Sequence, residues 1–213
     1  MIEIKNLYLK YIREYYALYD INFNVQKGES IALVGNEGSG KTTLLRVLAK
    51  LEKYDKGEIY IKDINLKKID FQTDVSLGYI SAVPVFMENK TVYENLKYVL
   101  KMRKMKPIDI ENKINTALID FGLEKFRNTK AKDLDIFTKY IISIVRLNLR
   151  DLDIVLIDDI FENLNDTQKN SIVSLIKAVF IDKKVTTLVA TNDENLLKKV
   201  CKRTIHFTSG SID

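Results

Sequence analysis

A glycine-rich segment at residues 35–42 has the residue types that bind phosphate. Its sequence, GNEGSGKT, carries glycines followed by lysine and threonine at the spacing of a P-loop, also called Walker A. Glycines let backbone N–H groups turn toward phosphate oxygens without a Cβ clash. Lys41 is expected to reach the terminal phosphates as a point charge, while the Thr42 hydroxyl would bind Mg²⁺. The segment therefore predicts a site for a nucleoside triphosphate.

The elements that must position this loop flank it on both sides. Residues 30–34 form an apolar run typical of a buried strand, and apolar residues between 41 and 51 have helical spacing. A chance glycine turn is the alternative, and these flanking elements disfavour it. The residues predicted to contact the nucleotide are Gly35, Asn36, Glu37, Gly38, Ser39, Gly40, Lys41, Thr42 and Thr43.

An acidic residue that could hold the metal ends a second apolar run. Residues 154–157 are Ile-Val-Leu-Ile, which favours a buried strand, and Asp158 follows them. A P-loop needs such a carboxylate at the end of a neighbouring strand. Asp158 could be only a helix cap or a turn residue, but the P-loop in the same chain favours the metal role. Thr42 and Asp158 are therefore the predicted metal ligands.

Strands alternate with helices in the second half of the chain. The strands are expected at 153–158, 186–190 and 204–207, with a helix at 139–149 before the first of them. This alternation predicts an α/β fold with a mostly parallel sheet covered on both faces. Short alternating segments within 1–30 and 57–70 predict an additional antiparallel β subdomain.

The middle third of the chain has a helical pattern. Thr91 and Glu94 have the spacing of a capping box, which opens a helix toward Met105. After Pro107, apolar residues recur at helical spacing until Gly122, a plausible helix stop. These segments predict a helical subdomain.

The length and composition fit one compact domain. The chain has 213 residues, of which 46% are hydrophobic and 30% charged, as in ordinary globular proteins. We expect a single domain over 1–213. Its nucleotide-binding core would comprise 1–86 and 139–213, and the helical subdomain would be inserted at 87–138.

The net charge of +5 is spread along the chain, because lysines alternate with acidic residues. Solvated faces explain this pattern, and no nucleic-acid partner is expected. A denser basic run at 101–106 is a weak candidate for contact with phospholipid head groups. The single cysteine, Cys201, excludes an internal disulfide and fits a reducing cytoplasm. No stretch is long enough to span a bilayer, so any membrane role would depend on a partner.

The two motifs, their separation and the helical insertion resemble the ATPase domain of ABC transporters over essentially the whole chain. The segments 77–80 and 84–96 resemble the region that this family uses against its membrane partner. Residues 150–153 precede the second motif as in the family, and 161–165 resemble its D-loop. The resemblance implies a P-loop NTPase (RecA-like) core that uses ATP and Mg²⁺.

The family resemblance also implies partners and a location. It implies an ATP-binding subunit that pairs head-to-tail with a second nucleotide-binding subunit and drives or gates a transmembrane permease. Homodimer and heterodimer both remain open. The expected location is cytoplasmic, at the inner face of the membrane through the permease. The family places an aromatic residue against adenine, for which Tyr11 is the nearest match and Tyr15 and Tyr16 are competing candidates.

Several positions depart from the family pattern. Ala82 stands where the family has a glutamine that senses the metal, and residues 134–138 lack every glycine of its signature. Within that segment Asp135 would direct negative charge at a phosphate. Asp159 replaces the glutamate that polarises water, with a carboxylate about 1.5 Å short of that position. Asn192 replaces the switch histidine and cannot carry its charge.

These departures share one direction. The groups that bind ATP and Mg²⁺ are kept, whereas those that orient water are altered, which predicts slow hydrolysis with Asp159 and Asn192 at the catalytic positions. The single histidine, His206, falls in a different strand and is interpreted as an ordinary strand residue. A regulatory or scaffolding ATP-binding module and a P-loop kinase remain the alternatives.

Overall fold

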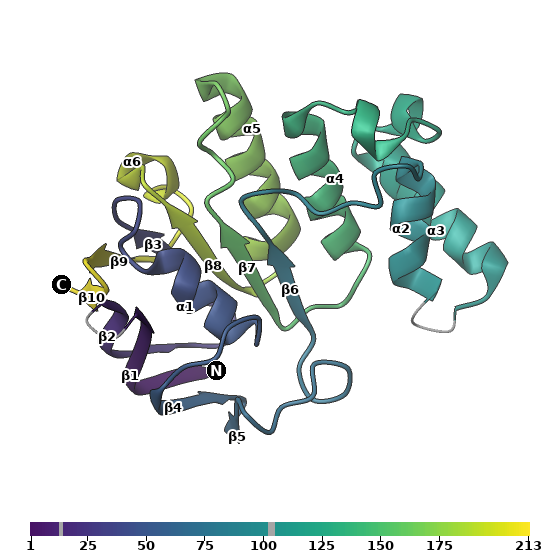
Figure 1. The fold of residues 1–213 in the computed structure, drawn as a ribbon. Coiled ribbons are helices and arrows are strands. Elements are labelled where there is room, and N and C mark those ends of the chain that lie inside the picture. The colour runs from purple at the N-terminus through teal and green to yellow at the C-terminus, as the bar shows by residue number, and fades with distance from the viewer. Residues whose placement is uncertain (13–14, 102–104) are drawn as a thin grey trace. The chain divides into compact units, whose positions relative to one another are not determined.

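The computed structural model describes residues 1–12, 15–101 and 105–213, and the chain divides into two compact units (Figure 1). The first unit comprises residues 1–82 and 152–213, and the second comprises 83–151. The insertion predicted at 87–138 lies within the second unit. Of the basic run at 101–106, residues 103 and 104 lie outside the described residues.

A six-stranded sheet forms the centre of the first unit. Its strands, in spatial order, are β10 (Ser211–Ile212), β9 (Arg203–Thr208), β3 (Ser30–Val34), β8 (Thr186–Thr191), β7 (Ile154–Asp158) and β6 (Leu77–Ile80). All neighbouring pairs are parallel except β10 with β9. Every residue of β3, β7 and β8 is buried, which explains their continuous apolar runs.

A second, antiparallel sheet belongs to the same unit. It contains β2 (Tyr15–Val25), β1 (Ile2–Ile12), β4 (Lys56–Ile61) and β5 (Ile64–Asn65), in that spatial order. The pairing of β1 with β2 changes register repeatedly between Ile4 and Ile12. These irregularities break the strict inward and outward alternation of side chains in the half of the hairpin that approaches the P-loop.

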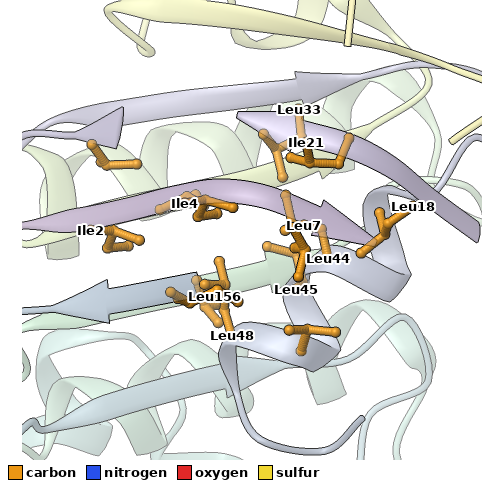
Figure 2. Close-up of a cluster of buried hydrophobic side chains, with 14 of the residues drawn as sticks. Ile2, Ile4, Leu7, Leu18, Ile21, Leu33, Leu44, Leu45, Leu48 and Leu156 are labelled. Atoms are coloured by element: carbon orange, nitrogen blue, oxygen red, sulfur yellow. The ribbon is translucent and has the colours of Figure 1, made fainter. Parts of the chain in front are cut away.

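The main hydrophobic core joins the two sheets to α1 (Lys41–Leu48). Figure 2 shows Leu44, Leu45 and Leu48 of α1 gathered with Leu156 of β7 and with the inward side chains of β1. All of these side chains are almost completely shielded from solvent. Burial of each leucine contributes about 1.5–3 kcal/mol relative to exposure. This packing anchors α1, and with it the loop that precedes it.

Two further helices complete the first unit. Helix α5 (Asp166–Ile176) begins at Asn165, which forms a reciprocal capping box with Gln168, and it continues into a π-helical turn at Lys177–Ile181. Helix α6 (Glu194–Leu197) is one short turn capped by Asp193. Within the described residues, no helix is both long and apolar enough to traverse a bilayer.

The second unit is helical and has its own apolar core. It contains α2 (Val92–Lys101), α3 (Pro107–Asp120) and α4 (Ile136–Asn148), with short 3-10 turns at Glu124–Phe126 and Ala131–Asp133. The capping box predicted from Thr91 and Glu94 is confirmed, since each residue's side chain accepts from the other's N–H at 3.1 and 2.9 Å. Gly122 has a φ of 63°, as expected after a helix end.

The predicted fold class is confirmed: an α/β molecule with a mostly parallel sheet, an antiparallel sheet and a helical unit. Two helix boundaries were predicted incorrectly. The helix expected over 41–51 ends at Leu48, because Lys50 is in the left-handed region with a φ of 57°. The helix expected at 139–149 starts three residues earlier, at Ile136, because Asp135 acts as its N-cap.

Candidate nucleotide-binding site

The loop between β3 and α1 leaves the start of the helix without a side-chain cap. Gly40 is the N-cap, with a φ of 106°, and α1 has no acidic residue in its first turn. A Cβ at residue 40 would lie 2.6 Å from the carbonyl oxygen of Ala17, so only glycine fits. The first N–H groups of α1 therefore have no capping side chain and can donate to an external anion.

A cavity of about 190 Å³ lies beside this loop. It is lined by the loop, the first turn of α1, the β1–β2 hairpin and the residue after β7: Tyr11, Tyr15, Ala17, Glu37, Gly38, Ser39, Gly40, Lys41, Thr42, Thr43 and Asp159. Seven of these eleven residues, 37–43, are positions predicted from the P-loop motif. The sequence analysis missed Ala17, which contributes through its backbone beside Gly40.

The ammonium of Lys41 lies inside the loop. Its Nζ donates to the carbonyl oxygens of Gly35 and Asn36, at 2.7 and 2.9 Å, and to Ser39 Oγ at 3.2 Å. Burial lowers the pKa of Lys41, while the nearby Asp159 and Asp158 carboxylates favour its charged form. A desolvated cation held by neutral carbonyls attracts phosphate more strongly than one in water.

Thr42 and Asp158 come together from separate elements. Thr42 stands at the second position of α1 and Asp158 at the end of β7, and Thr42 Oγ1 donates to Asp158 Oδ1 at 2.8 Å. A hydroxyl and a carboxylate are hard oxygen ligands of the kind that Mg²⁺ prefers. The donor set therefore fits a magnesium ion next to the phosphate loop.

The other oxygen of the Asp158 carboxylate also has a partner, Tyr79 of β6. Its hydroxyl donates to Asp158 Oδ2 at 2.8 Å. Burial and the adjacent Asp158 charge raise the pKa of Tyr79, so the phenol keeps its proton and acts as the donor. This role was not predicted from the sequence, because it depends on the pairing of β6 with β7.

Asp159 lies beside the cavity in an uncommon backbone conformation. Its φ is 41°, and its N–H donates to the carbonyl of Ala190 at 3.2 Å. Its Oδ1 is buried and, among the described residues, has no hydrogen-bond partner. Burial raises the pKa of Asp159; Lys41 opposes this effect and Asp158 adds to it. An unpartnered buried oxygen on a wall of the cavity is a group that a bound water or ligand could satisfy.

The structure separates the three candidate aromatic residues. Tyr11 and Tyr15 line the cavity and are half-exposed, with hydroxyls 3.3 Å from Thr43 Oγ1 and 3.4 Å from the Gly38 carbonyl oxygen. Tyr16 instead packs edge-on against Tyr8 and Tyr19, with ring centroids 6.0 and 5.0 Å away. Two tyrosines therefore have faces available for a base, and Tyr16 is engaged in an aromatic cluster.

The cavity lining does not include the predicted residues Gly35, Asn36 and Asp158, nor Asn192 and Ala82. Asn192 follows the end of β8 and is exposed. Ala82 is exposed and has only a methyl side chain, which cannot coordinate a metal. His206 lies on β9 and is also exposed, as expected for an ordinary strand residue.

In the helical unit, the carboxylate predicted to oppose a phosphate instead caps its own helix. Asp135 Oδ1 accepts from the Thr138 N–H and Oδ2 accepts from the Thr138 hydroxyl, both at 2.8 Å. Burial alone would raise the pKa of Asp135, but these hydrogen bonds outweigh it and lower the pKa. Both oxygens of Asp135 are thus used within the first turn of α4.

Known proteins are similar to this chain in sequence and in fold. Residues 18–162 match the family described as ABC transporter. Methionine import ATP-binding protein MetN of Clostridioides difficile is 27% identical over the whole chain, which spans 67% of that relative. ABC transporter A family member 11 of Dictyostelium discoideum is 30% identical over 92% of the chain, which spans 23% of that protein. The chain thus matches only part of each relative's length.

Solved structures agree with these sequence matches. The dimeric bacterial ABC transporter cassette MJ0796 superposes with a TM-score of 0.88 at 26% identity, covering 100% of this chain and 97% of the other. The same cassette in a post-hydrolysis state, bound to ADP and Pi, gives a TM-score of 0.87 at 25% identity. With its P-loop, its paired Thr42 and Asp158 and these matches, the chain belongs to the ABC transporter family of ATP-binding domains.

Proposed function

We propose that this chain binds Mg-ATP as the ATP-binding subunit of an ABC transporter and hydrolyses it slowly. The observation that carries the proposal is the 2.8 Å contact between Thr42 and Asp158, beside a buried Lys41 and an uncapped helix start. These contacts support a site in which phosphate ligands and metal ligands lie next to one another. This arrangement suits a triphosphate whose oxygens also bind a metal.

Different groups of the chain would bind the phosphates, the metal ion and the base. The N–H groups of the loop and of the first turn of α1 would donate to phosphate oxygens, and Lys41 would exchange its carbonyl partners for the terminal phosphates. Thr42 and Asp158 would hold magnesium, which when bound supplies positive charge to phosphate oxygens. Tyr11 or Tyr15 would stack on the base, an interaction typically worth about 1–3 kcal/mol.

Slow hydrolysis is inferred from the residues at the positions proposed to orient the attacking water. Asp159 has the chemistry of a general base and a raised pKa, but it is one methylene shorter than glutamate. A misplacement of this size can cost about 100-fold in rate. Asn192 can donate a hydrogen bond but cannot carry a proton charge, and Ala82 offers no polar side-chain atom. These residues therefore favour tight binding with weak turnover.

The partners are inferred from the relatives. Methionine import and sulfate/thiosulfate import ATP-binding proteins resemble this chain, and MJ0796 is described as a dimeric cassette. A second nucleotide-binding subunit and a transmembrane permease are accordingly proposed as partners, which would place the chain at the cytoplasmic face of the membrane. ATP would then bias the pair toward whichever state binds it better.

Nucleotide binding is tested by removing the buried ammonium. Lys41→Ala should weaken ATP binding about 10- to 100-fold, because hydrogen bonds to charged groups contribute about 1.5–3 kcal/mol. Equilibrium titration of the purified chain with ATP and Mg²⁺ measures the effect. Lys53→Ala, which removes an exposed lysine outside the loop, is the matched control. Unchanged ATP affinity in Lys41→Ala would contradict the site.

Slow turnover is tested by placing the longer glutamate at residue 159 and a histidine at residue 192. Asp159→Glu combined with Asn192→His should raise steady-state ATP turnover, by up to about 100-fold if the position of the base limits the rate. Glutamate at a φ of 41° carries a backbone strain of about 1 kcal/mol, so thermal unfolding is measured alongside. Asp159→Asn with Asn192→His lacks the base and should stay slow. Flat turnover in both variants would show that neither residue limits the rate.

A further inference from the structure

The carboxylate of Asp158 is held at both of its oxygens. Thr42 Oγ1 donates to Oδ1 and Tyr79 Oη donates to Oδ2, each at 2.8 Å. Asp158 is only 2% exposed, so solvent contributes little to its orientation. Two protein donors therefore determine which oxygen faces the start of α1.

The strand register explains how Tyr79 reaches Asp158. Strand β6 pairs in parallel with β7, and Tyr79 lies opposite Leu156, two residues before Asp158. Residues two apart on a strand point to the same face, so Tyr79 and Asp158 share a face of the sheet. The ring of Tyr79 is partly buried against the main core, which restricts its rotation. The phenol is therefore a fixed donor.

The chemistry of magnesium gives this donor a role. Mg²⁺ demands nearly ideal octahedral geometry, so a ligand that rotates binds it poorly. Partners that hydrogen-bond a metal ligand orient it, and their loss typically weakens metal binding about 10- to 100-fold. Within the described residues, Tyr79 is the side chain of β6 that contacts a predicted metal ligand.

We propose that Tyr79 is a positioning residue for the metal half of the site. By holding Oδ2 of Asp158, it keeps Oδ1 directed at Thr42 and so raises the affinity for Mg²⁺ when nucleotide is present. The inference rests on the proposed function, since it assumes that Thr42 and Asp158 receive the metal of Mg-ATP. It assigns Tyr79 a role in metal binding and none in binding the phosphates themselves.

The test separates the two halves of the site in the full-length chain. ATP affinity is measured by calorimetric titration in EDTA, and Mg²⁺ is then titrated at saturating ATP. For Tyr79→Phe we expect unchanged ATP affinity in EDTA and a Mg²⁺ half-saturation about tenfold higher. Tyr60→Phe is the matched control, because its hydroxyl donates to the exposed Glu58 at 3.2 Å. It should leave both measurements unchanged.

The results for Tyr79→Phe either support or overturn the positioning role of Tyr79. An unchanged or lower Mg²⁺ half-saturation in Tyr79→Phe overturns the inference. Loss of ATP binding in EDTA overturns it as well, because Tyr79 would then support the fold in general. Thermal unfolding of Tyr79→Phe is measured alongside: a higher Mg²⁺ half-saturation with an unchanged Tm supports the inference, and one accompanied by a large fall in Tm contradicts it. If the wild-type chain itself fails to bind ATP, the proposed function fails first.

Discussion

Helices α1 and α4 begin in opposite ways. Helix α1 starts at Gly40, with no capping side chain and no acidic residue in its first turn. Helix α4 starts at Asp135, whose carboxylate takes both the N–H and the hydroxyl of Thr138. One helix start is left for an external anion, and the other is satisfied by an anion of its own chain. The capacity of a helix start to bind an external anion thus depends on whether its first N–H groups already have a capping side chain.

The two helix starts also differ in what capping contributes to stability. Capping stabilises a helix by about 0.5–2 kcal/mol, so an uncapped start carries a cost that a bound phosphate can offset. At α4 the cap gives stability, and the added charge would oppose a second phosphate group. The start of α1 is therefore open to an external anion, whereas the start of α4 is closed by the carboxylate of Asp135.

If the open start of α1 binds the phosphates of ATP, an acidic side chain placed there should weaken ATP binding. Thr43→Asp places a carboxylate in the first turn of α1, where the side chain lines the cavity. Like charges brought together cost several kcal/mol, so ATP affinity should fall by at least about 100-fold. Equilibrium titration measures it, and Thr43→Ser, which keeps the hydroxyl, should bind nearly as wild type. ATP affinity close to wild type in Thr43→Asp would show that the open helix start is not what holds the phosphates.

A smaller effect is expected when the capping residue of α4 is replaced. Asp135→Ala should lower the free energy of unfolding by about 1 kcal/mol, because it removes the cap, and should lower Tm by about 2–4 °C. Asp135→Ser keeps a capping oxygen without the charge and should lie closer to wild type. Thermal unfolding by circular dichroism measures both variants, and equal stability of all three chains would refute the capping role.

The pH dependence of the same variants isolates the contribution of the charge. Because the pKa of Asp135 is lowered in the folded chain, its ionised form contributes stability above the unfolded pKa. That contribution is lost as the pH falls through the lowered folded pKa. The stability difference between wild type and Asp135→Ser should therefore shrink on acidification, and a difference independent of pH would assign the effect to geometry alone.

Local patterns predicted much of the fold. The P-loop, its flanking strand and helix and the capping box of Thr91 and Glu94 depend on residues close in sequence, and each is present in the structure. The start of α4 was missed because Asp135 was assigned to the family's signature segment by resemblance, although an acidic residue before an apolar helix is itself a capping signal. At Asp135 the capping signal predicts the start of α4 better than the family resemblance does.

The remaining features depend on contacts between distant segments. The choice among Tyr11, Tyr15 and Tyr16 depends on the hairpin of β1 and β2, whose register shifts cannot be read from alternation. The contact between Tyr79 and Asp158 depends on which strands are neighbours and on their register. The buried, unpartnered oxygen of Asp159 depends on the packing around the cavity. Such features require the tertiary structure.

The tight approach of Gly40 to the carbonyl of Ala17 bears on how this chain can change over generations. Most helices can gain stability through a single substitution that supplies a cap, and neutral drift samples such changes freely. Here any side chain at residue 40 would collide with the backbone of β2. Descendants that retain the hairpin must therefore inherit a bare helix start, even while residues such as Asp159 and Asn192 vary. The open helix start is thus preserved by sterics at residue 40.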